Sequence, residues 1–161
     1  KVSLVPTEGV LYFHPMEKFD DHYFMKQALL EAQKAYDADE VPVGAVVVID
    51  NKIIARAHNL TERLNDVTAH AEMQAITAAA NFLNGKYLIG CSLYVTLEPC
   101  VMCMGAIYWS QLSKVVFGAK DKKRGYQQAQ LTPHPKATVL EGIMADEAAV
   151  LIQGFFQKKR P

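Results

Sequence analysis

Residues 93–118 decide the fold, and they read LYVTLEPCVMCMGAIYWSQLSKVVFG. The first five, 93–97, are rich in aromatic and β-branched side chains, which predicts a buried strand. Pro99 stands where the first turn of a helix tolerates proline, so a helix is expected to follow as far as about Trp109. Residues 115–118 form a second apolar run and a second strand. A strand, a short helix and a strand in this order predict a parallel pair.

Upstream of this unit, the chain predicts a helix and a hairpin. Residues 20–36 repeat apolar side chains at intervals of three, four and seven, as one face of a helix does. Residues 43–49 are almost uninterruptedly apolar and β-branched, which is typical of a strand buried on both faces. Asp50-Asn51 is turn chemistry, and residues 52–57 read as the returning strand.

A second helix is expected to begin at Thr68, whose hydroxyl can cap it, and to run to about Phe82. Asn84-Gly85 is a typical helix stop. The side chains expected on its inner face are Ala69, Met73, Ile76 and Ala80.

The end of the chain predicts a loop over residues 121–137, a short strand over 138–140 and a last helix. Asp146 is the expected cap of that helix, with Val150, Leu151 and Phe155 turned inward. The hairpin and the parallel pair together require a mixed sheet. The expected fold is therefore α/β: a three-layer α/β/α sandwich with a mixed central sheet.

Length and composition limit the classes of function. The chain has 161 residues, and Lys plus Arg balance Asp plus Glu at 17 each, so no global charge favours nucleic acid or membrane. No apolar run approaches the roughly 20 residues that span a bilayer. We expect an N-terminal extension over residues 1–19, of which 1–15 are dispensable or not native, and one domain over 20–161. Three cysteines, an odd number, argue against a disulfide framework and indicate a reducing, cytoplasmic location.

Two short pieces carry the chemistry, residues 68–72 and residues 98–103. Cys100 and Cys103 are three apart at the start of the predicted helix, so their sulfurs share one face. The exposed N–H groups of a first turn favour negative charge and prepare thiolates for a metal. His70 adds one nitrogen, and two sulfurs with one nitrogen form a soft ligand set suited to zinc.

The number of ligands distinguishes a structural from a catalytic site. A closed structural zinc site takes four protein ligands, whereas a catalytic one takes three and leaves a position for water. Cys91 is the one further cysteine, and the predicted strand between it and Cys100 carries it far from the metal. The sequence therefore predicts an open, catalytic site with one Zn²⁺ per chain.

Glu72 is the predicted proton carrier. It is two residues from His70, and such residues share a site only if that site lies off the end of the helix rather than along its side. Zinc lowers the pKa of water from about 15.7 to about 7. Glu72 can take up the released proton and deliver it to a ring nitrogen and then to departing ammonia.

The order His70-Ala71-Glu72, then Pro99-Cys100-x-x-Cys103, resembles the signature of the zinc nucleobase deaminases. Within that superfamily the chain looks most like bacterial tRNA adenosine deaminases. The resembling pieces are residues 41–46, Asn59, 68–72, 93–105, 115–121 and 141–143.

The resemblance implies a cytidine deaminase-like fold and a zinc-dependent hydrolase that acts on the C–N bond of an amidine. It implies that His70, Cys100 and Cys103 bind the zinc and that Glu72 is catalytic. It also implies a homodimer that converts the wobble adenosine of a tRNA anticodon loop to inosine. The residues implied to bind substrate are Asn59, Val43, Ala71 and Pro99.

Two departures leave alternatives open. Val67 stands where the family has proline, and residues 122–140 look shorter than in the best-known tRNA enzymes and lack their Asn-His stretch. A deaminase of a free base or nucleoside, such as cytosine, guanine or cytidine, is the alternative. A non-catalytic zinc-stabilised binding protein is a third reading, which Glu72 argues against. The basic clusters at 120–124 and 158–160 are either solvated surface or an RNA-backbone patch.

Overall fold

The computed structural model describes residues 18–160. The prediction for residues 1–15 lies outside this range. In chain order the elements are α1 (Asp21–Asp37), β1 (Gly44–Ile49), β2 (Lys52–His58), α2 (Ala71–Leu83), β3 (Ser92–Leu97), α3 (Val101–Trp109), β4 (Lys114–Ala119), β5 (Thr138–Glu141) and α4 (Ala145–Lys159). Every predicted helix and strand is present, with ends that differ by a few residues.

The strands form one mixed sheet, as predicted. Its order is β2-β1-β3-β4-β5. β1 is antiparallel to both β2 and β3, whereas β3, β4 and β5 run parallel to one another. The parallel pair expected from residues 93–118 is therefore β3 and β4, connected by α3.

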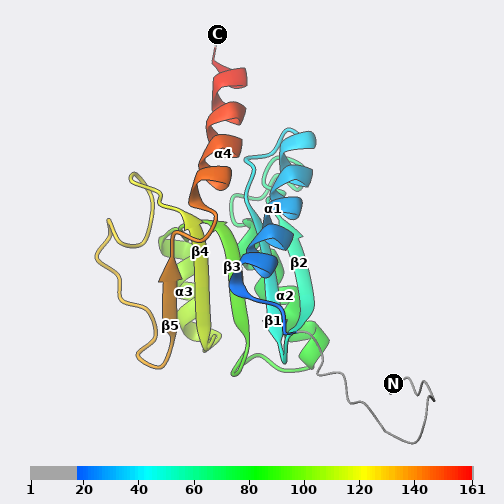
Figure 1. The fold of residues 1–161 in the computed structure, drawn as a ribbon, viewed down its shortest axis with the longest axis vertical. Coiled ribbons are helices and arrows are strands. Elements are labelled where there is room, and N and C mark those ends of the chain that lie inside the picture. Colours follow the sequence, from blue (N-terminus) through cyan, green and yellow to red (C-terminus); the bar gives the residue numbers. More distant parts are fainter. Residues whose placement is uncertain (1–17, 161) are drawn as a thin grey trace, which may run out of the picture.

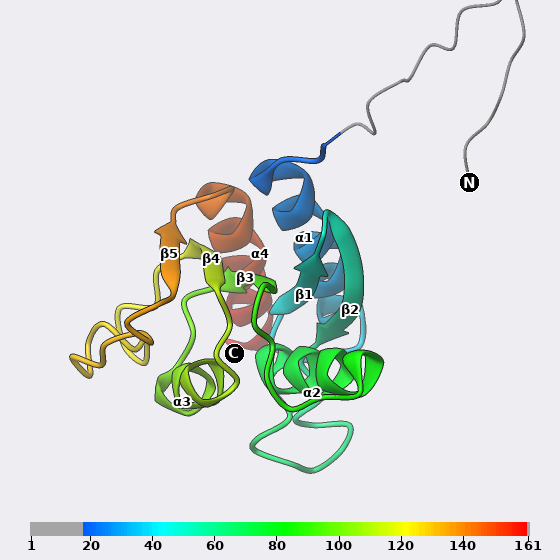
Figure 2. The same cartoon turned by 90° about the horizontal axis from the view of Figure 1, so that it is seen from below.

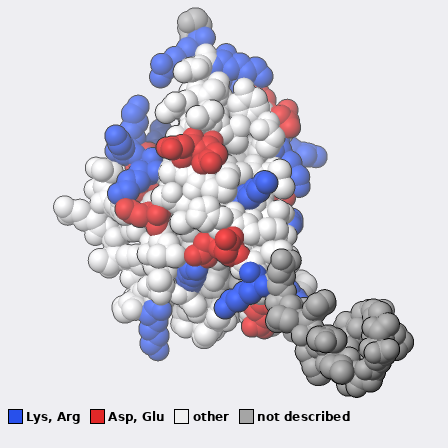
Figure 3. All heavy atoms as spheres, in the orientation of Figure 1, with Lys and Arg blue, Asp and Glu red and all other residues white. Residues whose placement is uncertain are grey.

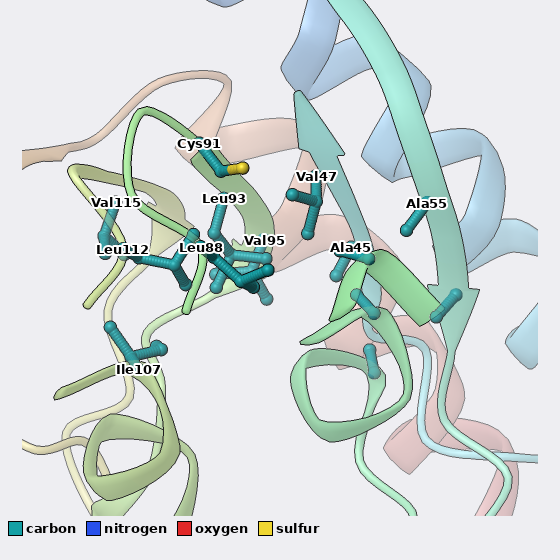
Figure 4. Close-up of a cluster of buried hydrophobic side chains, with 14 of the residues drawn as sticks. Ala45, Val47, Ala55, Leu88, Cys91, Leu93, Val95, Ile107, Leu112 and Val115 are labelled. Carbon is teal, nitrogen blue, oxygen red and sulfur yellow. The ribbon is translucent and has the colours of Figure 1, made fainter. Parts of the chain in front are cut away.

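Helices cover both faces of the sheet. Figure 2 shows α1 and α4 on one face and α2 and α3 on the other. The larger apolar cluster lies between the sheet and the α2–α3 layer, and Figure 4 shows part of it around Leu93, Val95 and Ile107. A smaller cluster packs α1 against β1, β3 and β4 through Phe24, Met25 and neighbouring side chains. The predicted three-layer α/β/α sandwich is confirmed.

The start of α2 differs from the prediction. His70, not Thr68, is the residue that precedes the helix. The Thr68 hydroxyl donates instead to Asp66 Oδ1 at 2.7 Å, and the Thr68 N–H donates to the same oxygen at 2.8 Å. The Ala71 N–H is capped from a distant part of the chain, by Asn59 Oδ1 at 2.8 Å. Local turn chemistry at Asp66 thus takes the hydroxyl that the sequence assigned to the helix.

The buried face of α2 includes part of the predicted set, since Ala69 is buried and Ile76 and Ala80 pack against the larger apolar cluster, but its centre is made of other alanines. Ala71, Ala75 and Ala79 are fully buried, while Met73 is half-exposed. These small side chains let the helix lie close to the sheet.

The last helix also begins differently. α4 starts at Ala145 after Met144, which adopts a left-handed conformation (φ 53°), so Asp146 lies in the first turn rather than at the cap. Its charge still suits the helix N-terminus. Phe155 is buried as predicted and Leu151 is partly buried, but Val150 is 69% exposed because it lies on the side of α4 opposite to the buried Ala148 and Phe155.

One edge of the sheet gathers the connections that matter for function. β3, β4 and β5 are parallel, so their carboxyl ends lie together at this edge, which runs across the strand ends. We call it the functional edge, and the arrowhead of β5 marks it in Figure 1. Antiparallel β1 begins there and β2 ends there. No helix between residues 18 and 160 is long and apolar enough to cross a bilayer.

Candidate metal centre

Two helix starts bring the predicted zinc ligands together. His70 immediately precedes α2 and Cys100 immediately precedes α3, both with extended backbone. Cys103 lies in the first turn of α3 and is fully buried. The site therefore lies off the ends of two helices at the functional edge of the sheet, as the spacing of His70 and Glu72 required.

The distances fit a single metal ion. The sulfurs of Cys100 and Cys103 lie 3.7 Å and 3.6 Å from His70 Nδ1. Zinc bonds of about 2.05 Å to nitrogen and 2.3 Å to sulfur, at a tetrahedral angle, place the two atoms about 3.6 Å apart. His70 Nδ1 is therefore the nitrogen directed at the site.

The group contains three ligands. Among residues 18–160, His70, Cys100 and Cys103 are the His, Cys, Asp and Glu side chains whose ligand atoms converge, all within 4.8 Å of one another. Cys91 belongs instead to the buried apolar cluster of Figure 4, above Leu93. Three ligands leave a fourth tetrahedral position for water, the arrangement of a catalytic rather than a structural zinc site.

Mutual hydrogen bonding polarises the two thiols and the imidazole. The side chain of Cys103 donates to Cys100 and lowers the pKa of the Cys100 thiol to about 4. The same interaction raises the pKa of Cys103. Cys100 also raises the pKa of His70, against the effect of burial. A thiolate is thus already favoured at Cys100, which prepares the centre for a cation.

Glu72 lies in the first turn of α2 and is 3% exposed. Burial raises the pKa of its carboxyl to about 7, although its hydrogen bond with the Cys103 side chain works in the opposite direction. A carboxyl that titrates near neutral pH is suited to take up a proton and release it again. Glu72 is not among the converging ligand atoms, and its hydrogen bond with Cys103 places its carboxyl beside them.

The structure brings together three of the four predicted substrate-binding residues. The Asn59 N–H donates to the Val43 carbonyl at 3.1 Å, and Asn59 Oδ1 accepts from the Ala71 N–H. Val43 and Ala71 belong to the same buried cluster. Because its oxygen is engaged, Asn59 offers its Nδ2 group as the donor. Pro99, the fourth, is buried beside Cys100.

Two buried carboxylates at the functional edge, Glu40 and Glu98, were not predicted from the sequence. Glu40 accepts from the Thr61 hydroxyl at 3.1 Å and from the N–H groups of Glu62 and Arg63 at 3.1 and 2.8 Å. Glu98 accepts from backbone N–H groups of the segment after β4. The signal available in the sequence was an acid next to an apolar run in each case, with proline close behind (Glu40-Val41-Pro42, Glu98-Pro99).

A cleft of about 610 Å³ opens on the same edge, between the end of α1, the segment after β2 and the end of α4. Its lining combines cations with aromatic rings: Ala38, Asp39, Val41, Glu62, Arg63, Phe155, Phe156 and Lys159. Lys159 pairs with Asp39 across it. The predicted basic cluster 158–160 therefore contributes to a hollow rather than to a free tail.

Known proteins agree with this geometry. A tRNA-specific adenosine deaminase of Aquifex aeolicus is 47% identical over 143 residues, which cover 86% of this chain and 95% of that protein. A structure from a study of A-to-I editing by tRNA:A34 deaminases superposes with a TM-score of 0.75 at 44% identity, covering 80% of this chain and 98% of that one. A guanine deaminase from Bacillus subtilis superposes with a TM-score of 0.62 at 38% identity, covering 69% and 70%.

Residues 18–119 match the cytidine and deoxycytidylate deaminase zinc-binding region. This match includes all three converging ligands and Glu72. The signature, the fold and the three-ligand centre thus agree, and the chain belongs to the cytidine and deoxycytidylate deaminase family of zinc-binding enzymes.

Proposed function

We propose that this chain deaminates adenosine to inosine at the wobble position of tRNA. The observation that carries the proposal is the open three-ligand centre with a buried glutamate beside it, in a chain 47% identical to a tRNA-specific adenosine deaminase. The identity extends over 95% of that relative, so the substrate-facing parts are included.

His70 Nδ1 and the sulfurs of Cys100 and Cys103 are the atoms that would hold zinc. When bound, zinc supplies the acidity that turns water into a nucleophile at neutral pH. The overall reaction adds the oxygen of water to C6 of adenine, breaks the C6–N bond and releases ammonia. Glu72 takes the proton from water, gives it to the ring nitrogen N1, and later passes protons to the departing amine.

The residues around this carboxyl would orient the nucleoside. Asn59 Nδ2 donates a hydrogen bond to the substrate, since Oδ1 is held by Ala71. Val43 and Ala71 wall the base, and Pro99 lies close to the reacting amino group. A base must leave its stack to enter such a site, which favours the unpaired nucleotides of a loop.

The cleft between the end of α1, the segment after β2 and the end of α4 supports an RNA substrate. Arg63 offers a cation for phosphates, and Phe155 and Phe156 offer faces for neighbouring bases, whereas Lys159 is paired with Asp39. Figure 3 shows blue and red groups interspersed on the α1–α4 face, with blue concentrated near the end of α4. RNA binding would thus depend on a local patch rather than on net charge.

We also propose that the domain spans residues 20–161, is cytoplasmic and acts as a homodimer. Trp109 at the end of α3 is 77% exposed, and Val101 at the start of the helix is 49% exposed. Exposed apolar side chains on a short helix favour contact with a second copy.

One comparison tests the substrate. The protein is incubated with a tRNA carrying adenosine at the wobble position and, separately, with free guanine, cytosine and cytidine. Inosine in the tRNA is the expected product. Free guanine is the leading alternative substrate, because the fold is similar to that of a guanine deaminase. Release of ammonia from guanine, with no inosine formed in the tRNA, would favour that alternative.

A further inference from the structure

The carboxylate of Glu98 closes a loop across the rim of the metal centre. Glu98 follows β3 directly and is 4% exposed. Its Oε2 accepts the Asp121 N–H and its Oε1 accepts the Gln127 N–H, both at 3.0 Å. The two donors stand at the two ends of residues 121–127, which we call the rim loop. A single side chain therefore determines how both ends of the rim loop are placed.

The rim loop lies directly on the segment that carries a metal ligand. Gly125 forms an antiparallel bridge with Cys100, and the Tyr126 N–H donates to the Pro99 carbonyl at 2.9 Å. A Cβ atom on Gly125 would lie 2.3–2.5 Å from the Glu98 carboxylate, closer than atoms approach. The fit between Gly125 and Glu98 therefore requires glycine.

The cations of the rim loop project outward while its backbone is held inward. Asp121 Oδ1 accepts the N–H groups of Lys123 and Arg124 at 2.9 and 3.0 Å. The side chains of Lys122, Lys123 and Arg124 are exposed. None of the ion pairs found within the described chain engages these three side chains.

Arg124 is the cation of the rim loop that lies next to the metal-ligand segment in the fold. It adjoins Gly125, which is bridged to Cys100. An uncompensated guanidinium beside the centre is suited to a phosphate oxygen.

We infer that Glu98 is a positioning residue: it fixes the rim loop against Cys100 so that Arg124 binds a phosphodiester of the polynucleotide whose base enters the centre. This inference rests on the proposed tRNA substrate. It gives residues 121–127 a task in substrate recognition and assigns Glu98 to binding rather than to proton transfer.

The test is a double-mutant cycle on the full-length zinc enzyme with tRNA. Glu98→Gln keeps the size of the side chain, but its NH₂ group must face one of the two backbone donors. We expect zinc content and kcat to stay within about twofold, and KM for tRNA to rise about tenfold, the effect of one lost buried hydrogen bond. Arg124→Ala should raise KM similarly and reduce the slope of log KM against log salt by about one. The double variant should be little worse than either single variant.

Gly125→Ala breaks the same contact independently and serves if Glu98→Gln does not fold. Lys136→Ala, which removes an exposed cation outside the rim loop, is the matched control and should leave KM and the salt slope nearly unchanged. Additive effects of Glu98→Gln and Arg124→Ala, a fall in kcat alone, or an equal effect of Lys136→Ala would each overturn the inference. If the wild-type enzyme makes no inosine in tRNA, the proposed function itself fails, and that is seen before any variant is compared.

Discussion

Two loops approach the metal centre from opposite sides of the functional edge, and a buried carboxylate holds each of them. Glu40, at the end of the α1–β1 connection, binds residues 61–63 through three donors. Glu98 binds the rim loop through two backbone donors. Each loop carries one arginine at this edge, Arg63 or Arg124. In both cases a buried carboxylate binds the backbone N–H groups of an arginine-containing loop, although the two pairs come from different parts of the chain.

The two devices differ in what else they touch. Glu98 is separated from Cys100 only by Pro99, so the rim loop and a metal ligand share one short segment. Glu40 is remote in sequence from every ligand, and the loop it holds reaches His70 only through several turns. Disturbance of the first loop should therefore act on stability and on RNA contacts away from the metal, whereas disturbance of the rim loop should act on the phosphodiester contact beside the metal.

The largest expected effect is that of Glu72→Gln, which should change the chemical step without changing substrate binding by either loop. Glu72→Gln keeps the size of the side chain but removes the proton acceptor, so kcat should fall about 10²–10⁴-fold. KM for tRNA and zinc content should barely change, because both loops and all three metal ligands are retained. Single-turnover inosine formation and metal analysis measure this. A variant that keeps more than a tenth of the wild-type kcat would remove Glu72 from its role.

Asn59, at the start of the first loop, has two roles that variants can separate: it caps α2 and is proposed to bind substrate. Asn59→Ala should lower kcat/KM about 10–100-fold and also destabilise α2 by about 0.5–2 kcal/mol, since the Ala71 N–H loses its acceptor. Asn59→Asp is the matched control: it keeps the acceptor but loses the donor. It should retain the stability of the wild type and still lose activity. Urea unfolding and steady-state kinetics on the two variants distinguish the roles, and a fully active Asn59→Asp would assign the residue to structure alone.

Glu40→Gln should reduce stability more than activity. Burial alone would raise the pKa of Glu40, but hydrogen bonds from Arg63, Glu62 and Thr61 outweigh it and lower the pKa. A folded-state pKa below the unfolded value stabilises the fold above about pH 4.3, and this contribution disappears as the pH falls through the folded-state pKa. We expect the variant to lose about 1–3 kcal/mol at pH 7. In urea titrations the difference from wild type should shrink below pH 4, and a constant difference would refute the ionic explanation.

The smallest expected effect concerns Arg63 in the first loop. Arg63→Ala should raise KM for tRNA only a few-fold and reduce the salt slope by about one, the signature of a single phosphate contact. Its kcat should equal that of the wild type. An unchanged salt slope would show that the cleft does not hold the RNA backbone.

The metal centre was predictable because its geometry is local. Cys100 stands at the N-cap of α3 and Cys103 lies in its first turn, and His70 and Glu72 share the start of α2, so the spacing constrained each pair. The parallel pairing of β3 and β4 was predictable for a similar reason, since a strand, a short helix and a strand permit few arrangements.

What the sequence did not reveal depends on contacts between distant segments. The cap of α2 comes from Asn59, and the acceptor for Thr68 is Asp66, so no local pattern marked the true helix start. Glu98 looked like one more residue of a strand-to-helix turn. Its role depends on Gly125, and that contact exists only after the chain has folded.

The buried alanines of α2 allow the helix very little movement relative to the sheet. Ala71, Ala75 and Ala79 are fully buried, so the helix rests on the sheet at the spacing that methyl groups permit. Because Ala79 is fully buried, we expect an added methylene there to displace the whole helix as a rigid rod. Because His70 and Glu72 are at the far end of that rod, a small displacement there misaligns the proton carrier while the fold survives. Evolution can therefore vary the outward face of α2 freely, whereas its inward face is as constrained as the catalytic residues.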